Sequence, residues 1–398
     1  SIVVNSNADD TLVNLNSNGT CDLREAITNA NNDDQSGSTE CPSGAGTDTI
    51  TFAESYVISL NGSQLPTITS PLSITGIGPT SAYTIIQAST CDPISGGCTP
   101  SVNRVFQVSS TGNLTLDLLT VRYGYCNGTC PNDFLNGIGG GILNEGSLTI
   151  TNSTISNNKT NFSAGGIYSL GTASLTILNS TISNNSTSSQ GGGMWVAKGT
   201  VTNTTIVGNT GGQGAGIFKQ SVFPGGDQFL VITNSTISGN NIHNNGSRVS
   251  ISNSIINNSD CTSSSISDGG NNLDSANNCD FITNALINTN PNLGSLTNNG
   301  GPTETMALLA GSAAIDAGNA TICTNIGNKD QRGVTRPQGT GCDIGAYEFG
   351  PIIPIVTASN PSASAVLTSL SSITVVFNQD MLDNNTNNGA ENVNNYIL

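Results

Sequence analysis

Residues 148–158 read LTITNSTISNN, and this block decides the fold because it recurs along the chain. Further copies are LTILNSTISNN (175–185), TVTNTTIVGN (200–209), LVITNSTISGN (230–240) and VSISNSIINN (249–258). The asparagine in the middle of each copy follows the previous one after 27, 24, 31 and 19 residues. Repeats of this length are typical of solenoids, whose coils bury a continuous core only by stacking.

Apolar residues alternate within residues 148–158 as they do on a β-strand. Leu148, Ile150 and Asn152 share one face, whereas Ile155 is out of step with them. A bend at residues 152–154 returns Ile155 to the interior, so we expect a corner of the coil there. Glycine clusters that suit tight corners come before four of the copies, each followed by an apolar residue, namely Ile142, Ile167, Met194 and Ile217. The pattern predicts an all-β, right-handed parallel β-helix (solenoid).

Stacked coils would place the central asparagines in one column, in which each amide bonds to the next. We predict that this structural ladder contains Asn152, Asn179, Asn203, Asn234 and Asn253. The alternative is glycosylation, because the first four head an Asn-x-Thr sequon. Their apolar flanks and regular repetition favour the ladder. Sequons outside the repeat are better candidates for glycosylation, and these are Asn61, Asn127 and Asn245.

The composition favours an elongated exported protein over a compact one. The chain has 398 residues, of which 47 are glycine and only 9% are charged. Its net charge of -16 would repel a phosphate backbone, so nucleic acid is excluded as a partner. Scattered carboxylates could hold Ca²⁺, but a solvated acidic surface is the simpler interpretation.

The ten cysteines occur as close neighbours in the sequence, which predicts local disulfides because a solenoid keeps its contacts local. An even number without a CxxC…CxxC arrangement indicates an oxidising compartment and staples across loops, as opposed to zinc or redox chemistry. The predicted pairs are Cys21–Cys41, Cys91–Cys98, Cys126–Cys130, Cys261–Cys279 and Cys323–Cys342.

Two further features of the sequence agree with export to the cell surface or the extracellular space. No stretch of 18 apolar residues exists, so no membrane span is expected. The chain starts with SIVVNSNADD and lacks a basic and apolar leader, as a processed export product would.

Residues 21–31, CDLREAITNAN, predict a short N-terminal helix that covers the first coil. Asp22 caps it with Glu25 three residues later, as in a capping box. Leu23, Ala26, Ile27 and Ala30 form the apolar stripe. We expect Arg24 and Glu25 to be an exposed pair without a catalytic role.

Both ends of the chain resemble known segments of exported bacterial proteins. CDLREAITNAN, followed by DTITF (48–52), resembles the CSLREA motif of secreted bacterial β-helix proteins, with Asp22 in place of serine. NNGGPTETMALLAGSAAIDAGN (298–319) and DQRGVTRPQGTGCDIGAYEFG (330–350) resemble the choice-of-anchor Q domain. The resemblance implies an exported β-helix of adhesin type and identifies no ligand.

The charged residues of the second motif predict a small ion-pair cluster in a closing cap. Arg332 and Arg336 are close in sequence to acidic residues, and the disulfide Cys323–Cys342 would clamp the loop between them. The alternative is a Ca²⁺ site, the one cofactor considered, at Asp316, Asp330 and Asp343.

Residues 351–398 resemble the opening of a surface-layer-type immunoglobulin-like domain. Such a β-sandwich needs about 100 residues, so we expect either a partial domain or strands supplied by another subunit. The predicted organisation is an N-terminal cap (1–60), parallel β-helix coils (61–297), a C-terminal closing region (298–350), and a linker with a partial Ig-like domain (351–398).

Catalytic chemistry has no recognisable support in the sequence. A polysaccharide lyase or hydrolase on a solenoid needs acids that repeat at coil spacing, and the repeats carry threonine and serine at those positions. The single histidine, His243, lies in an asparagine-rich stretch and is expected to be a solvated loop residue.

The sequence therefore predicts a non-catalytic extracellular surface protein, a stalk or an adhesin. Its partners would be the cell envelope or an extracellular glycan or protein, and the candidates for sugar stacking are Tyr168 and Trp195. Two alternatives remain open: a subunit that self-associates through its ends into an extracellular filament or sheath, and a polysaccharide lyase or hydrolase.

Overall fold

The structure is a computed structural model, and it describes most of the chain in two units. Described are residues 1–9, 18–92, 103–128, 130, 137–221, 229–246, 248–264 and 266–350, with the backbone of 356–360 and 374–377. The first unit is Ser1–Phe349 and the second is Gly350–Leu398. Most of the predicted partial Ig-like domain lies outside the described residues, and its antiparallel strands β33 (Val356–Asn360) and β34 (Thr374–Phe377) leave that hypothesis untested.

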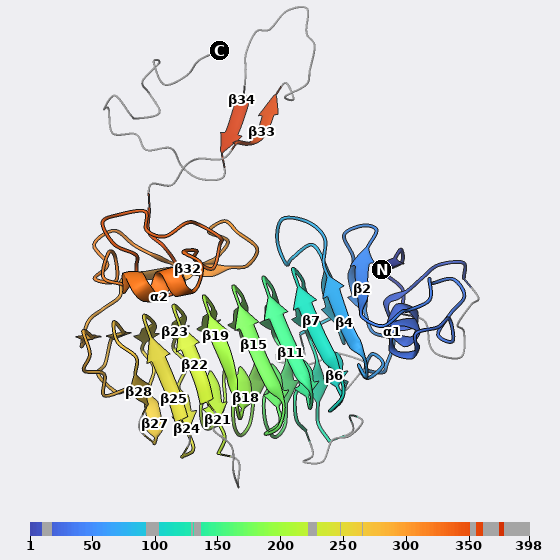
Figure 1. Cartoon of the computed structure of the whole chain (residues 1–398), viewed down its shortest axis with the longest axis horizontal. Helices are drawn as coiled ribbons and strands as arrows, with labels where there is room; N and C mark the ends of the chain where they lie inside the picture. Colours follow the sequence, from blue (N-terminus) through green and yellow to red (C-terminus); the bar gives the residue numbers. More distant parts are fainter. Residues whose placement is uncertain are drawn as a thin grey trace, which may run out of the picture. The chain divides into compact units, whose positions relative to one another are not determined.

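The first unit is nearly all β and is built on three long parallel sheets, as a solenoid requires (Figure 1). Neighbouring strands of each sheet come from successive repeats of the sequence, which confirms the coarse fold class. Sheet A contains, in spatial order, β1 (Ile2–Val4), β2 (Asp48–Phe52), β4 (Pro71–Thr75), β7 (Asn113–Asp117), β11 (Ser147–Thr151), β15 (Ser174–Leu178), β19 (Gly199–Thr202), β22 (Phe229–Thr233), β25 (Arg248–Ser252) and β28 (Ser267–Asp268).

The other two sheets follow the same order along the stack. Sheet B contains β3 (Val57–Ser59), β5 (Ile85–Gln87), β8 (Thr120–Arg122), β12 (Thr154–Ser156), β16 (Thr181–Ser183), β20 (Thr205–Val207), β23 (Thr236–Ser238), β26 (Ile255–Asn257), β29 (Leu273–Asp274) and β30 (Leu286–Ile287). Sheet C contains β6 (Phe106–Val108), β10 (Ile142–Asn144), β14 (Ile167–Ser169), β18 (Met194–Val196), β21 (Ile217–Lys219), β24 (Ile242–Asn244) and β27 (Cys261–Ser263). A smaller sheet joins β9 (Tyr125–Cys126), β13 (Lys159–Thr160) and β17 (Ser186–Thr187).

Each coil buries a few aliphatic side chains that meet the equivalent residues of the next coil. Leu148 and Ile150 pair in register with Leu175 and Ile177 on sheet A, and all four are buried. Ile155 pairs with Ile182 on sheet B and is also buried. The predicted bend makes this possible, because Asn152 has a φ of 48° and so turns the chain between β11 and β12.

The corner asparagines form the expected column in two parts. Asn179 donates to Asn152 at 3.4 Å and Asn203 donates to Asn179 at 3.2 Å. Farther along, Asn253 donates to Asn234 at 3.0 Å. The two parts are separated because Nδ2 of Asn234 donates to Sγ of Cys323 at 3.7 Å, which leaves Oδ1 of Asn203 without a partner among the described residues.

A second asparagine ladder, not predicted from the sequence, runs through the interior. Asn158 donates to Asn185 at 2.9 Å, Asn185 to Asn209 at 3.0 Å, and Asn209 to Asn240 at 2.7 Å. All four side chains are buried. Each of these side-chain oxygens, from Asn185 onward, also accepts the backbone N–H of the preceding asparagine. Water does not reach this buried corner, so the ladder supplies the hydrogen-bond partners that its polar groups would otherwise lack.

Helix α1 (Leu23–Asn32) begins at the predicted capping box, since the Asp22 side chain accepts from the Glu25 amide and the Glu25 side chain accepts from the Asp22 amide. Its apolar stripe packs against β1 in the same core as the coils. The expectation of an exposed Arg24 and Glu25 was wrong, because both are buried. Arg24 forms a bidentate ion pair with Asp9, at 2.8 and 2.9 Å, and donates to the carbonyl of Gln64, so distant segments of the chain cover this side of the helix.

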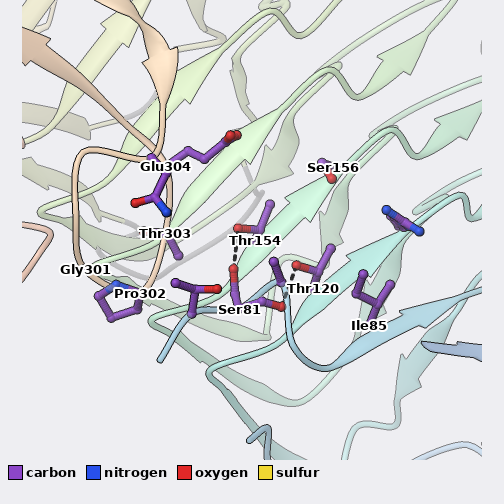
Figure 2. A pocket seen from close by; sticks show the side chains of 13 residues that line it. Ser81, Ile85, Thr120, Thr154, Ser156, Gly301, Pro302, Thr303 and Glu304 are labelled. Carbon is purple, nitrogen blue, oxygen red and sulfur yellow. Dashed lines mark hydrogen bonds between the residues drawn. The ribbon is translucent and has the colours of Figure 1, made fainter. Parts of the chain in front are cut away.

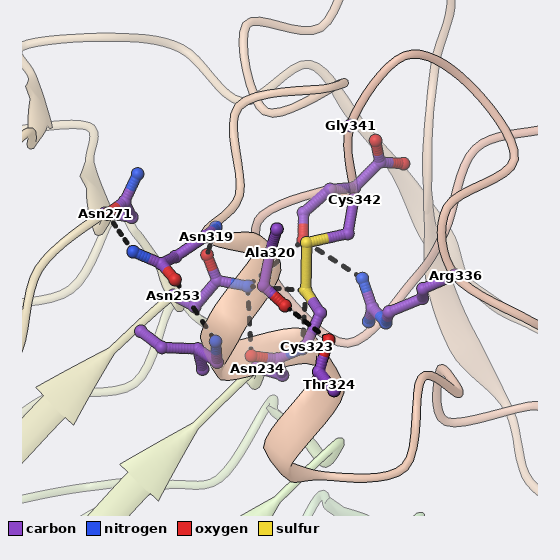
Figure 3. Close-up of a disulfide and its surroundings, with 12 residues drawn as sticks. Asn234, Asn253, Asn271, Asn319, Ala320, Cys323, Thr324, Arg336, Gly341 and Cys342 are labelled. Carbon is purple, nitrogen blue, oxygen red and sulfur yellow. Dashed lines mark hydrogen bonds between the residues drawn. A yellow bond between two sulfur atoms is a disulfide. The ribbon is translucent and has the colours of Figure 1, made fainter.

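A second helix, α2 (Ala320–Asn325), was not predicted from the sequence. The side chain of Asn319 caps it by accepting from the amides of Thr321 and Ile322. Because it is only six residues long, it carries no apolar periodicity for a sequence pattern to detect. The disulfide Cys323–Cys342 fixes it beside the corner column, where Asn234 and Asn253 both approach Sγ of Cys323 (Figure 3).

The C-terminal segment, residues 298–349, does not close the end of the stack as expected. It runs back along the side of the coils, and Figure 1 shows it in orange beside the strands. The amide of Gly345 donates to the carbonyl of Asn253, and much farther along the stack the amide of Ser81 donates to the carbonyl of Pro302. We call this segment the C-terminal strap. Strands β31 (Leu293–Thr297) and β32 (Thr305–Leu308) form an antiparallel pair at its start.

Candidate functional site

The outer face of sheet B carries a column of hydroxyl groups, and this column positions the candidate site. The middle residue of each strand, such as Ile155 or Ile182, points into the core, so the first residue points outward. Strand pairing places these first residues in register from coil to coil. We call the central five the threonine column: Thr120, Thr154, Thr181, Thr205 and Thr236.

The C-terminal strap binds three members of the threonine column. Thr181 donates to the carbonyl of Glu304 at 2.6 Å, and Thr205 donates to Oε1 of Gln331 at 2.6 Å. Thr236 accepts from the amide of Ala346 at 3.1 Å. The sequence repeat that builds the coils thus also builds the surface that holds the strap.

Farther along sheet B, the outward column becomes apolar and the contact with the strap becomes hydrophobic. Ile255 and Leu273 pair in register and are buried beneath the strap. They share one cluster with Leu308, Ala314 and Ile344. The strap is therefore held by hydrogen bonds over one part of the sheet and by apolar packing over the other.

A groove of about 320 Å³ remains at the other end of the threonine column. Its floor is the outer face of β5, β8 and β12, where Ile85, Thr120 and Thr154 lie side by side (Figure 2). Two loops form its walls, residues 80–82 from an early coil and residues 298–304 from the strap. A volume of this size lies at the lower end of the range of small-ligand sites, which is roughly 300–1,000 Å³.

Ser81 ties the two walls to the floor. Its amide donates to the carbonyl of Pro302 at 2.8 Å, and its hydroxyl bonds to that of Thr154 at 2.9 Å. Thr120 donates to the carbonyl of Ser81 at 2.9 Å. Segments more than 200 residues apart in sequence are therefore held in one rigid frame.

The groove contains one cation and one anion that do not pair with each other. Nε of Arg122 donates to Gln87 at 2.8 Å and the guanidinium lies 4.6 Å from the centre of the Tyr123 ring. Its terminal nitrogens have no acceptor among the residues that the structure describes. Glu304 is exposed, and its carboxylate has no hydrogen bond or ion pair with any described residue. Ser156 adds a hydroxyl group to the same lining.

The three candidate Ca²⁺ ligands lie within the strap, outside the groove. Asp330 is buried and pairs with Arg332 at 2.7 Å, while Asp316 accepts from the amide of Gly341 at 2.9 Å. Asp343 accepts from the amides of Asp316 and Phe349, and burial raises the pKa of Asp343 to about 7. Within the described residues, no three His, Cys, Asp or Glu side chains are arranged to hold a metal ion. The Ca²⁺ site remains a hypothesis, and the contacts that the structure shows are those of the ion-pair cluster.

A second buried ion pair completes that cluster. Arg336 and Glu348 are fully buried and pair at 3.0 Å. Glu348 also accepts from the amides of Gln338 and Asp343, at 2.8 and 2.9 Å. These N–H groups donate to both carboxylate oxygens of Glu348 and so join separate segments of the strap to one another.

The two candidates for sugar stacking, Tyr168 and Trp195, lie on the outer face of sheet C and stack on each other at 4.4 Å between ring centroids. Only 4% and 9% of their surfaces are exposed, so their ring faces are occupied by protein. Phe218 and His243 extend this column, and their rings lie 5.0 Å apart. His243 is thus part of β24 and not a loop residue, and burial lowers the pKa of its imidazole.

Four of the five predicted disulfides join described cysteines: Cys21–Cys41, Cys126–Cys130, Cys261–Cys279 and Cys323–Cys342. The fifth prediction, Cys91–Cys98, involves Cys98, which lies outside the described residues. Disulfides of this number are consistent with an extracellular protein. Among the described helices, none is long and apolar enough to cross a membrane.

Two of the three candidate glycosylation sites are more exposed than the ladder asparagines. Asn61 and Asn245 are exposed and Asn127 is half-buried, so an enzyme could reach at least the first two. In contrast, Asn203, Asn234 and Asn253 are buried. Glycosylation at Asn61, Asn127 and Asn245 remains a prediction.

In comparisons with known proteins, no family model, curated protein or solved structure matches the chain significantly. The resemblances of both chain ends to exported bacterial proteins therefore remain hypotheses.

Proposed function

We propose that this chain is a non-catalytic extracellular surface protein, a stalk or an adhesin, built on a right-handed parallel β-helix. The observation that carries the proposal is the uninterrupted stack of coils whose outer faces carry hydroxyl groups. On sheet A, Thr115, Thr149, Thr176 and Thr200 form a second in-register column. A rigid rod with neutral polar sides suits display and adhesion.

The disulfides and the low content of charged residues support this role outside the cell. Each described disulfide closes a short loop, of 4 to 20 residues, and so fastens a local segment where no reducing system acts. The low content of charged residues, 9%, leaves hydroxyl and amide groups to interact with water and ligands.

Immunogold electron microscopy of the source cells tests the location. Antibodies raised against the folded chain are expected to label the outer surface of intact cells. Labelling confined to the cytoplasm of sectioned cells would overturn the proposal.

The absence of catalysis is tested separately by incubating the protein with a panel of neutral and acidic polysaccharides. We expect no new reducing ends and no absorbance from unsaturated uronates. Either product, in an amount proportional to the protein added, would establish the lyase or hydrolase alternative.

Assembly through the chain ends is the second candidate function. It is favoured by Ile282, which is 87% exposed beside the last described coil, and by Ile287 in the terminal strand β30, which is 40% exposed. An open strand edge with exposed apolar residues favours self-association. Sedimentation velocity across a concentration series tests this, because a filament subunit must form larger species as its concentration rises.

A further inference from the structure

The groove between residues 80–82 and residues 298–304 has the properties of a ligand site. We propose that it binds a neutral, hydroxyl-rich oligosaccharide of one or two sugar rings at a time. This inference rests on the proposed adhesin role and specifies the chemical class of the partner.

The rigidity of the groove is the first argument. Its floor consists of three consecutive strands, and its walls are fixed by the bonds of Ser81 to Pro302, Thr154 and Thr120. A site held in one shape before binding loses little entropy when the ligand enters. Neither wall has to close over the ligand.

The unpaired charges are the second argument. Sugar hydroxyls both donate and accept, so they can donate to the carboxylate of Glu304 and accept from the free nitrogens of Arg122. Ser156 can do either. Charge-assisted hydrogen bonds of this kind are about twice as strong as bonds between neutral groups.

The balance of charge and surface selects neutral sugars over other polar ligands. One carboxylate beside one guanidinium gives the lining no net charge, and the chain as a whole carries -16, which disfavours polyanions. Ile85 and Pro302 add apolar surface to the lining, against which the C–H face of a pyranose ring can pack. Figure 2 shows these two residues on either side of Ser81 and Thr120.

Isothermal titration calorimetry of the complete chain tests the proposal. The probes are the tetrasaccharides of maltose, cellulose, chitin and mannan type, with tetragalacturonate as the anionic comparison. We expect at least one neutral probe to bind and tetragalacturonate to bind more weakly. The absence of binding by all neutral probes at millimolar concentration, or tighter binding of tetragalacturonate, would overturn the proposal.

Two variants locate the binding. Glu304→Gln keeps the shape of the side chain and removes its charge, and it should raise Kd about tenfold, the loss expected for one charge-assisted hydrogen bond. Ser156→Ala should raise Kd by a smaller factor. The matched control is Glu54→Gln, because Glu54 is also exposed and does not line the groove. Equal affinities for Glu304→Gln and the parent chain would exclude the groove as the site.

These results separate the ligand from the role. If antibodies label the chain at the cell surface but it binds no neutral sugar, the proposed function stands and this inference fails. If the chain binds sugars but lies in the cytoplasm, this inference stands and the proposed function fails.

Discussion

Asn185 donates from Nδ2 to Oδ1 of Asn209 at 3.0 Å, one coil farther along the solenoid, and both side chains are buried. The same Nδ2 reaches the carbonyl of Ile155 in the preceding coil at 2.9 Å. One amide group thus connects three successive coils. Ladders of this kind bind each coil to its neighbours through directional bonds, in addition to the apolar core.

Replacing Asn185 by alanine should destabilise the protein by roughly 3 kcal/mol, because several buried groups lose their partners and each costs about 1–3 kcal/mol. Chemical denaturation monitored by circular dichroism measures the loss. The matched control is Asn179→Gly, because Asn179 is a half-buried member of the corner column and glycine tolerates its φ of 51°; this variant should cost about 1 kcal/mol. A smaller loss for Asn185→Ala than for Asn179→Gly would show that the interior ladder does not dominate.

Lys219 should make the stability of the fold vary with pH in the alkaline range. Its side chain is buried, and burial lowers the pKa of its amine to about 8 from 10.5. The unfolded chain therefore binds more protons between these values, so stability rises with pH from about 8 to about 10.5 and is lowest, for this group, at neutral pH. Denaturation midpoints measured at pH 7 and pH 10 should show the increase.

The variant Lys219→Met identifies the group responsible. It removes the buried charge and should stabilise the protein at pH 7 by at most about 3 kcal/mol, the value of the full pKa shift. It should also lose most of the rise between pH 8 and 10. If the parent and the variant respond equally to pH, then the charge on Lys219 is not the cause.

Removing the Gln331 side chain should loosen the C-terminal strap while the coils stay folded. Its amide bonds to Thr181, Thr205 and Thr303, and to the carbonyl of Glu304. Gln331→Ala should cost roughly 2 kcal/mol, as expected when several buried hydrogen bonds are lost together. Hydrogen exchange should increase in residues 298–349, and Gln338→Ala, at an exposed position, should leave it unchanged. Equal rates of hydrogen exchange for the strap in the Gln331→Ala variant and in the parent chain would contradict the role assigned to this residue.

Reduction of the disulfides should loosen the ends and loops more than the central coils. The described pairs fasten α1, the loop after β9, the last coils and α2, and none joins two coils within residues 142–258. Hydrogen exchange before and after reduction tests this. Equal loss of protection in every segment would show that the disulfides hold the whole stack together.

The coils could be predicted from the sequence because their determinants are local and repeated. Three local features specify the corner at Asn152. The strand before it alternates apolar residues, the asparagine itself suits a positive φ, and the next apolar residue breaks the alternation. The capping box of α1 is specified in the same way, by Asp22 and Glu25. The interior ladder also has a signal in the sequence, since four blocks end in Asn158, Asn185, Asn209 and Asn240.

The groove and the strap could not be predicted because they depend on contacts between distant segments. Nothing near Ser81 in the sequence indicates that Pro302 will lie beside it. Arg24 was expected to be exposed for the same reason, since Asp9 and Gln64 cover it only in the folded chain. Tyr168 and Trp195 could be proposed as aromatic candidates from the sequence, but their burial depends on the packing around them in the folded chain.

The strap changes how the rod responds to mechanical load. In a plain solenoid, where each coil contacts only its neighbours, a pull on one end can peel the coils away one after another. Here a force entering through Phe349 is shared among Thr181, Thr205 and Thr236, which belong to three different coils. These attachments must rupture before the strap separates from the coils, so the side of the stack resists peeling at more than one coil.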